Sequence, residues 1–290
     1  MSKLILIFKW NVILMAWNLT LGSQPQTYLS AKWITFFLNH FAEKKKRKWA
    51  LRILALSPHY FIDNWQPAGR TPRKNLYLER QLQNTIDSRR KIYDLILKDR
   101  LGEEMTVVDY GCGPGVLARI VSGHAKKVYG CDISTGVLDC ARILSPAPNL
   151  EYVAADEAGM DGIPDGSVDV VYSFAVVQHL SRESIETVFE NCYRKLKPGG
   201  KILFHVHMDG SVFGTEEDCR ADTSLKGKIK YRYDLHCFAR SPGFFLEMLP
   251  AKGFAGIEIV EIAGLVGGDI FDDICSQHLL TARRKSISAE

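Results

Sequence analysis

The chain has 290 residues, of which 46% are hydrophobic and 24% charged, proportions that are ordinary for a globular protein. This length suffices to bury a full α/β core and leaves room for an extension. The net charge of +4 conceals an asymmetry, because residues 1–100 hold 18 basic and 6 acidic side chains (+12) and residues 101–290 hold 19 and 27 (−8). The basic part would favour an anionic surface, such as a membrane leaflet or a nucleic acid.

The cysteines argue against two kinds of scaffold. There are seven, an odd number, and none forms a Cys-x-x-Cys pair. Neither a disulfide framework nor a zinc site is indicated, so we expect no bound metal. A reducing compartment is the simpler interpretation, and we expect a cytoplasmic protein with possible membrane association.

Residues 4–21 are strongly apolar but are interrupted by Lys9, Asn11 and Asn18. A membrane-spanning helix needs about 20 largely uncharged residues, and a signal peptide needs an unbroken apolar stretch and a cleavage site. Two other interpretations are favoured over a membrane-spanning helix and a signal peptide. They are a hydrophobic helix packed on the protein or a partner, and an interfacial membrane anchor.

Residues 30–43 have helical apolar spacing, and the basic run 44–48 follows. That run is either a solvated helix face or linker, or a contact with anionic lipid, substrate or RNA. A loop rich in proline and aromatic residues precedes the next helix. We therefore interpret residues 1–72 as a hydrophobic and basic helical extension, with a possible peripheral membrane contact, and residues 73–290 as the main domain.

A helix is predicted over 73–100, and the segment 105–115 after it organises the chain. A short β-rich run ends at Asp109, three glycines spaced two apart follow, and an apolar-periodic helix begins at Val116. A strand, a glycine turn and a helix N-terminus are the usual geometry for holding a nucleotide-like ligand. Gly111 and Gly113 let the backbone approach that ligand, and the amides opening the helix are expected to face it.

The spacing of this turn disfavours a dinucleotide. The dinucleotide fingerprint would place its third glycine at position 116, where this chain has Val116, with Gly115 before it. Asp109 also repels a pyrophosphate and attracts an ammonium group.

Strands and helices then alternate, which predicts a parallel sheet. A strand over 127–130 leads to Asp132, 21 residues beyond Gly111, where a carboxylate can accept hydrogen bonds from both ribose hydroxyls; the alternative role of Asp132 is a helix cap. Further strands are expected at 150–154, 201–205, 256–262 and 278–282, with a turn and a strand over 163–173, and helices at 182–196 and 242–252. The polar and aromatic insert 208–240 is longer than a plain connection and is a candidate acceptor-site lid.

Five segments in this order carry a family resemblance, chiefly Val-Val-Asp-x-Gly-Cys-Gly-x-Gly at 107–115 and Leu-Lys-Pro-Gly-Gly at 196–200. Over about residues 75–284 the chain resembles the class I S-adenosylmethionine-dependent methyltransferases, closest to the group that methylates quinones, sterols and natural products. The resemblance implies an α/β fold with a doubly wound, mostly parallel seven-stranded sheet whose last strand is antiparallel.

The resemblance also implies site residues, which we carry over by position. Asp109 and the turn Gly111, Cys112, Gly113 and Gly115 would hold the methionine end of S-adenosyl-L-methionine. Asp132 would bind the ribose, Ile133 would pack on the adenine, and Asp156, in preference to Glu157, would bind the adenine amine. Phe174 and Gln178 would line the mouth of the pocket, with Tyr77 and Arg80 as weaker candidates.

The implied reaction is in-line transfer of a methyl group to a small-molecule acceptor, possibly lipophilic. A hydroxyl acceptor would need a general base, and the candidates in order are His179, His207 and His236, each of which has a purely structural role as its alternative. Two other hypotheses stay open: an RNA or protein methyltransferase that uses the basic N-terminal region for recognition, and a nucleoside-binding protein of the same fold that does not methylate, such as an aminopropyl transferase or an NAD-linked oxidoreductase.

Overall fold

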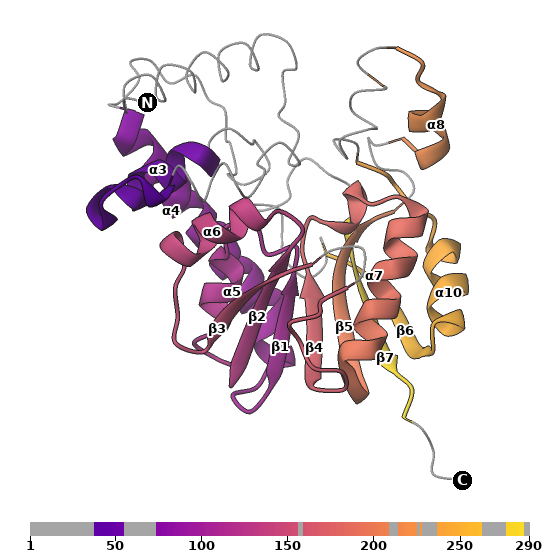
Figure 1. Cartoon of the computed structure of the whole chain (residues 1–290). Helices are drawn as coiled ribbons and strands as arrows, with labels where there is room; N and C mark the ends of the chain where they lie inside the picture. The colour runs from indigo at the N-terminus through magenta and orange to yellow at the C-terminus, as the bar shows by residue number, and fades with distance from the viewer. Residues whose placement is uncertain are drawn as a thin grey trace.

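The structure, a computed structural model, describes residues 38–54, 74–155, 159–208, 214–224, 227, 237–262 and 277–286. Its centre is a seven-stranded sheet in the order β3-β2-β1-β4-β5-β7-β6 (Figure 1). The strands are β1 (Thr106–Tyr110), β2 (Lys127–Asp132), β3 (Leu150–Ala154), β4 (Val168–Ser173), β5 (Leu196–His207), β6 (Phe254–Glu261) and β7 (Gln277–Arg284).

The first five strands are parallel, and β7 runs antiparallel to both β5 and β6. This arrangement confirms the predicted mostly parallel sheet with an antiparallel last strand. Strand β5 begins earlier than expected, within the predicted turn at 196–200. Its first residue, Leu196, pairs with Val168 of β4, and the positive φ of Gly199 (78°) allows the chain to bend before regular pairing resumes at Lys201.

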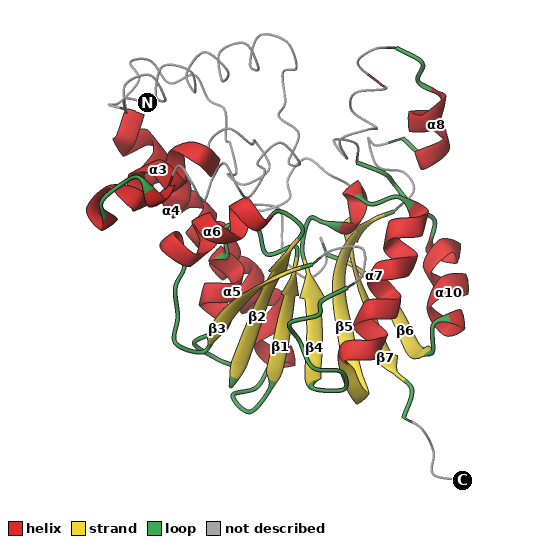
Figure 2. Ribbon diagram, viewed as in Figure 1, coloured by secondary structure: helices red, strands yellow, loops and turns green. Residues whose placement is uncertain are grey.

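Helices cover both faces of the sheet (Figure 2). One face carries α3 (Glu43–Leu54), α4 (Lys74–Ile92), α5 (Val116–Val121) and α6 (Thr135–Leu144), and the other carries α7 (Arg182–Lys195) and α10 (Pro242–Ala251). Helix α4 continues as a π-helical turn, Tyr93–Leu97, and a short 3-10 helix, Lys98–Arg100. Each face has its own apolar cluster, as expected for a parallel sheet buried on both sides.

The described part of the N-terminal extension belongs to this framework. Helix α3 contributes the buried side chains of Leu51, Ile53 and Leu54 to the same apolar cluster as Val107 of β1. Arg47, within the basic run, pairs with Glu79 of α4 at 3.0 Å. Among the helices in the described ranges, none is long and apolar enough to cross a bilayer. The apolar run 4–21 lies outside the described residues.

The insert after β5 contains a buried ion pair, one partner of which also binds the segment after β4. It contains α8 (Glu216–Ala221), which begins with a capping box formed by Thr215 and Asp218. Arg240 donates to Glu216 at 2.8 Å and to the carbonyl of Leu180 at 2.7 Å, and both charged side chains are less than a tenth exposed. The insert is therefore tied to the segment that follows β4.

Arg240→Leu should lower the free energy of unfolding by about 3–5 kcal/mol, because it leaves the Glu216 carboxylate buried beside fewer cations. Urea unfolding measures this effect. Lys126→Ala, which removes an exposed ion pair with Glu104 (3.7 Å), is the control and should cost less than about 1 kcal/mol. Equal losses in the two variants would contradict a structural role for the buried pair.

Candidate active site

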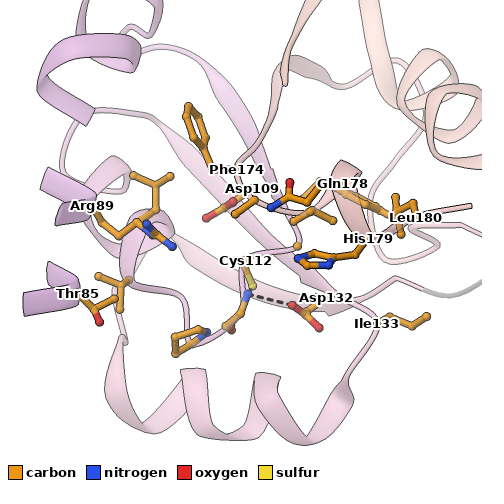
Figure 3. A pocket seen from close by; sticks show the side chains of 18 of the residues that line it. Thr85, Arg89, Asp109, Cys112, Asp132, Ile133, Phe174, Gln178, His179 and Leu180 are labelled. Carbon is orange, nitrogen blue, oxygen red and sulfur yellow. Dashed lines mark hydrogen bonds between the residues drawn. The ribbon is translucent and has the colours of Figure 1, made fainter. Parts of the chain in front are cut away.

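A cavity of about 340 Å³ lies at the carboxyl ends of β1, β2 and β4 (Figure 3). Its walls come from α4, the glycine turn after β1, the residues after β2, the segment after β4, and Cys237 of the insert. Strand order reverses between β1 and β4. Open α/β sheets bind their ligands at such a reversal, outside the carboxyl ends of the strands.

The glycine turn adopts backbone conformations that would be strained for other residues. Gly111, Gly113 and Gly115 all have positive φ, at 75°, 52° and 74°. A Cβ atom at Gly111 would lie 2.2 Å from a methyl group of Val176, and one at Gly115 would lie 2.0 Å from the hydroxyl oxygen of Tyr152. These glycines therefore let other parts of the protein approach the turn, in addition to any ligand.

The amides of the glycine turn have partners within the protein. The amides of Gly111 and Cys112 both donate to the carbonyl of Cys131 at 2.8 Å. The Gly115 amide donates to the carbonyl of Cys112 at 3.0 Å. The turn therefore lets a ligand come close to its backbone, while its amides hold the turn against the end of β2.

Asp132 joins the two loops at this end of the sheet. Its Oδ2 accepts from the Gly113 amide and its Oδ1 from the Ser134 amide, each at 2.9 Å. The carboxylate is buried and lines the cavity. Burial raises its pKa, and the two amide hydrogen bonds oppose that rise. Asp132 is not the cap of α6, whose N-cap residue is Ser134, but it orders the residue before that helix and also lines the cavity.

Asp109 is the other carboxylate of the cavity and is 3% exposed. Its Oδ2 is buried without a hydrogen-bond partner. Burial raises its pKa to about 7, and the Arg89 guanidinium partly opposes the rise. A buried carboxylate oxygen with no donor is costly unless a ligand satisfies it. The site is therefore suited to a ligand that brings a cation or a proton donor to Asp109.

Arg89 is a pocket residue that the sequence analysis missed. It lies on α4 one helical turn beyond Thr85, and both side chains line the cavity. Burial lowers its pKa, and Asp109 opposes that change. Of the two candidates that the sequence analysis named on α4, Arg80 is exposed and is not among the residues lining the cavity. The side chain of Tyr77 lies outside the described part of the chain. The four-residue spacing of Thr85 and Arg89 on the helix before β1 is the signal that would have indicated this face.

The segment after β4 holds a strained residue at the cavity wall. Ala175 has φ of 59°, a left-handed conformation that is uncommon outside glycine. Its amide donates to Nδ1 of His205 at 3.3 Å, so the ring proton is on Nε2, which donates to Gln277 Oε1 at 2.6 Å. Burial lowers the pKa of His205 to about 3, which keeps the ring neutral. His205 and Gln277, which the sequence analysis also missed, hold this turn in place.

Gln178 and His179 lie on the short 3-10 helix η4 (Val177–His179) and line the cavity, as does Phe174 at the end of β4. Gln178 is 7% exposed and its Oε1 has no hydrogen-bond partner. His179 Nδ1 lies 3.6 Å from the Cys237 Sγ atom. Figure 3 shows the His179 ring pointing into the cavity on the side of Asp132, while Ile133 lies at the edge with 66% of its surface exposed.

The other predicted residues lie elsewhere. His207 is buried on β5 and is not among the residues lining the cavity, and burial together with His278 lowers its pKa to about 4. Asp156, Glu157 and His236 are outside the described residues. Within the described ranges, no cluster of three or more histidine, cysteine, aspartate or glutamate side chains is arranged to hold a metal ion.

Comparison with known proteins agrees with this geometry. Residues 108–204 match the family described as "Methyltransferase domain". The ubiquinone biosynthesis O-methyltransferase of Pseudomonas entomophila is 32% identical over 162 residues, which are 55% of this chain and 67% of that protein. The malonyl-[acyl-carrier protein] O-methyltransferase of Serratia marcescens is 33% identical over 111 residues, 38% of this chain and 41% of that protein. The chain therefore spans about two fifths to two thirds of the length of these relatives.

The fold also matches a solved structure. Phosphoethanolamine N-methyltransferase 2 of Haemonchus contortus, in complex with S-adenosyl-L-methionine, superposes with a TM-score of 0.50 at 20% identity, covering 76% of this chain and 62% of that one. Sheet, glycine turn and sequence similarity lead to one class. The chain belongs to the S-adenosylmethionine-dependent methyltransferases, and the cofactor of this family is S-adenosyl-L-methionine.

Asp109→Asn should stabilise the cofactor-free protein, and the gain should grow by roughly 2–3 kcal/mol between pH 5 and pH 8. The folded protein holds the Asp109 proton up to about pH 7, while the unfolded chain releases it near pH 3.8, so this residue's stabilising contribution is lost as the pH rises. Urea unfolding across this pH range measures the difference. A gain that does not change with pH would show that Asp109 is not a buried, costly carboxylate.

His205→Leu should flatten the loss of stability on acidification. The pKa of His205 is about 3 in the folded protein and about 6.5 when unfolded, so its contribution is full above pH 6.5 and is lost as the pH falls toward 3. The variant should also be less stable at pH 8, by about 1–3 kcal/mol, because Ala175 and Gln277 lose their partner. Denaturation at several pH values tests both effects.

Proposed function

We propose that this protein transfers the methyl group of S-adenosyl-L-methionine to a small-molecule acceptor. The observation that carries the proposal is the buried, unpartnered oxygen of Asp109 beside the glycine turn, in a cavity that Arg89 also lines. A carboxylate and a guanidinium in one cavity complement the ammonium and carboxylate of an amino acid. The cofactor, when bound, supplies a sulfonium methyl group.

The remaining cavity walls fit the nucleoside half of this cofactor. Each oxygen of Asp132 accepts one backbone amide and retains acceptor capacity for a ribose hydroxyl. Ile133, two-thirds exposed at the cavity edge, offers an apolar surface for a purine ring. In this assignment Asp109 and Arg89 hold the amino-acid end, and Asp132 and Ile133 hold the nucleoside.

The acceptor would occupy the part of the cavity between η4 and the insert. Phe174, Leu180 and Cys237 supply apolar or weakly polar surface there, and Gln178 and His179 supply polar atoms. We assign His179 as the base that takes the proton from an acceptor hydroxyl, because it is the candidate histidine that lines the cavity. His207 and His236 rank after it. The names of the two relatives, both O-methyltransferases, support an oxygen acceptor.

The sulfonium charge is neutralised during methyl transfer, so the protein gains most by aligning the acceptor and excluding water. The C-terminal end of the insert would help to align the acceptor and exclude water. The Phe238 amide donates to the Gln178 carbonyl at 2.7 Å, and Arg240 binds the Leu180 carbonyl. These bonds connect the insert to the wall that would hold the acceptor.

For location we propose the cytoplasm, with peripheral membrane contact through the N-terminal segment. The support is the thiol state of the described cysteines and the basic run at the start of α3. The alternative of an RNA or protein methyltransferase would use the same basic run, and the alternative of an oxidoreductase would need NAD. Calorimetry with S-adenosylhomocysteine and NAD separates a methyltransferase from an oxidoreductase, because an oxidoreductase should not bind the first ligand.

Asp132→Ala should weaken cofactor binding by about 1–3 kcal/mol, because it removes charged hydrogen bonds to the ribose and loosens the Gly113 turn. Isothermal titration with S-adenosylhomocysteine provides the affinity. Asp139→Ala, on α6 and outside the cavity, is the matched control and should bind as the wild type does. Unchanged affinity in Asp132→Ala would remove this residue from the site.

His179→Ala should lower the rate of methylation of a hydroxyl acceptor by about 10²–10⁴-fold, while the affinity for the cofactor is preserved. A screen of metabolite and lipid extracts for a mass gain of one methyl group identifies the acceptor and then serves as the assay. Normal turnover in His179→Ala would end the assignment of His179 as the base. Loss of turnover together with loss of cofactor binding would indicate a structural role instead.

A further inference from the structure

We propose that Cys237 and His179 form a reactive thiol–imidazole pair inside the cavity, which makes Cys237 a modification site for small soft electrophiles. The Cys237 Sγ atom lies 3.6 Å from Nδ1 of His179, and both side chains line the cavity. Both are half-buried, so a small molecule that enters the cavity reaches the sulfur. This inference goes beyond the proposed methyl transfer and does not require it.

The pair differs from the other thiols of the described chain. Cys112, Cys131, Cys140 and Cys192 are buried, and burial raises the pKa of each, which keeps the sulfur in its unreactive thiol form. Cys112 shows the contrast within the same cavity, because Asp132 and Asp109 raise its pKa further. Cys237 instead faces an imidazole, the neighbour that favours a thiolate.

The chemistry of the pair is a proton transfer followed by substitution. The thiol proton passes from Sγ to Nδ1 of His179, which leaves a thiolate beside an imidazolium. A sulfur electron pair then attacks the electrophilic carbon of an alkyl halide, the new S–C bond forms, and the carbon–halogen bond breaks to release halide. The imidazolium later returns its proton to solvent, so charge and atoms balance.

A second, independent feature indicates which electrophiles the cavity accepts. Gln178 is more than nine-tenths buried, lines the same cavity, and leaves its Oε1 atom without a hydrogen-bond partner. A ligand that carries an N–H or O–H group would satisfy this oxygen. The best-matched class is therefore a small uncharged electrophile with a hydrogen-bond donor, and iodoacetamide, with its primary amide, is the simplest probe.

The test measures alkylation of the full chain by iodoacetamide at pH 7, with the rate at each cysteine read from peptide mass spectrometry. Cys219, on α8 and outside the cavity, has a similar intermediate exposure and is the internal control. We expect Cys237 to react about tenfold faster than Cys219. His179→Ala and the bulkier His179→Phe should bring the Cys237 rate down to that of Cys219, and Gln178→Leu should slow Cys237 to a smaller extent.

Equal rates at Cys237 and Cys219 in the wild type, or a Cys237 rate unchanged in both His179 variants, would overturn the proposal. Circular dichroism confirms that each variant is folded. Calorimetry with S-adenosylhomocysteine separates this inference from the proposed function, because Cys237 is assigned to the acceptor part of the cavity. Fast, His179-dependent alkylation in a protein that does not bind S-adenosylhomocysteine supports the pair and counts against the proposed cofactor site alone.

Discussion

The carboxylate of Asp132, which binds one amide on each side of the cleft, is the interaction on which the site depends. The parallel register of β1 and β2 sets Tyr110 opposite Cys131, so the two strands end together. The loop after each strand then meets at Asp132, through Gly113 on one side and Ser134 on the other. A small shift of either loop would move both the glycine turn and the Asp132 carboxylate that lines the cavity.

Two features of the cavity destabilise the protein, and a bound ligand could offset their cost. Asp109 is buried with an unpartnered oxygen, and Ala175, after the neighbouring strand β4, holds a strained backbone at the cavity wall. Strain and raised carboxylate pKa values are common at binding sites, where the surrounding structure maintains them. Here that support comes from Arg89 on α4 and from the neutral His205 between Ala175 and Gln277.

The cavity wall beside η4 is assembled from distant parts of the chain. Cys237 and His179 are 58 residues apart in sequence, and Arg240 reaches the carbonyl of Leu180 across 60 residues. The insert therefore supplies one side chain of the cavity wall, Cys237, and its Arg240 holds the residue that follows the 3-10 helix carrying Gln178 and His179.

The sequence alone determined the sheet and the loops that meet at the glycine turn. Alternating apolar segments and turn residues predicted the strands, and the spacing of Gly111, Gly113 and Asp132 along the chain was sufficient to indicate their shared loop region. These features are local or lie at the ends of neighbouring parallel strands, so a pattern in the sequence reports them. Only the tertiary structure placed Arg89 and Cys237 at the cavity, His205 behind Ala175, and His207 away from the cavity lining. The spacing of Thr85 and Arg89 indicates one helix face, but no local pattern in the sequence says which helix face, strand face or distant insert packs against the site.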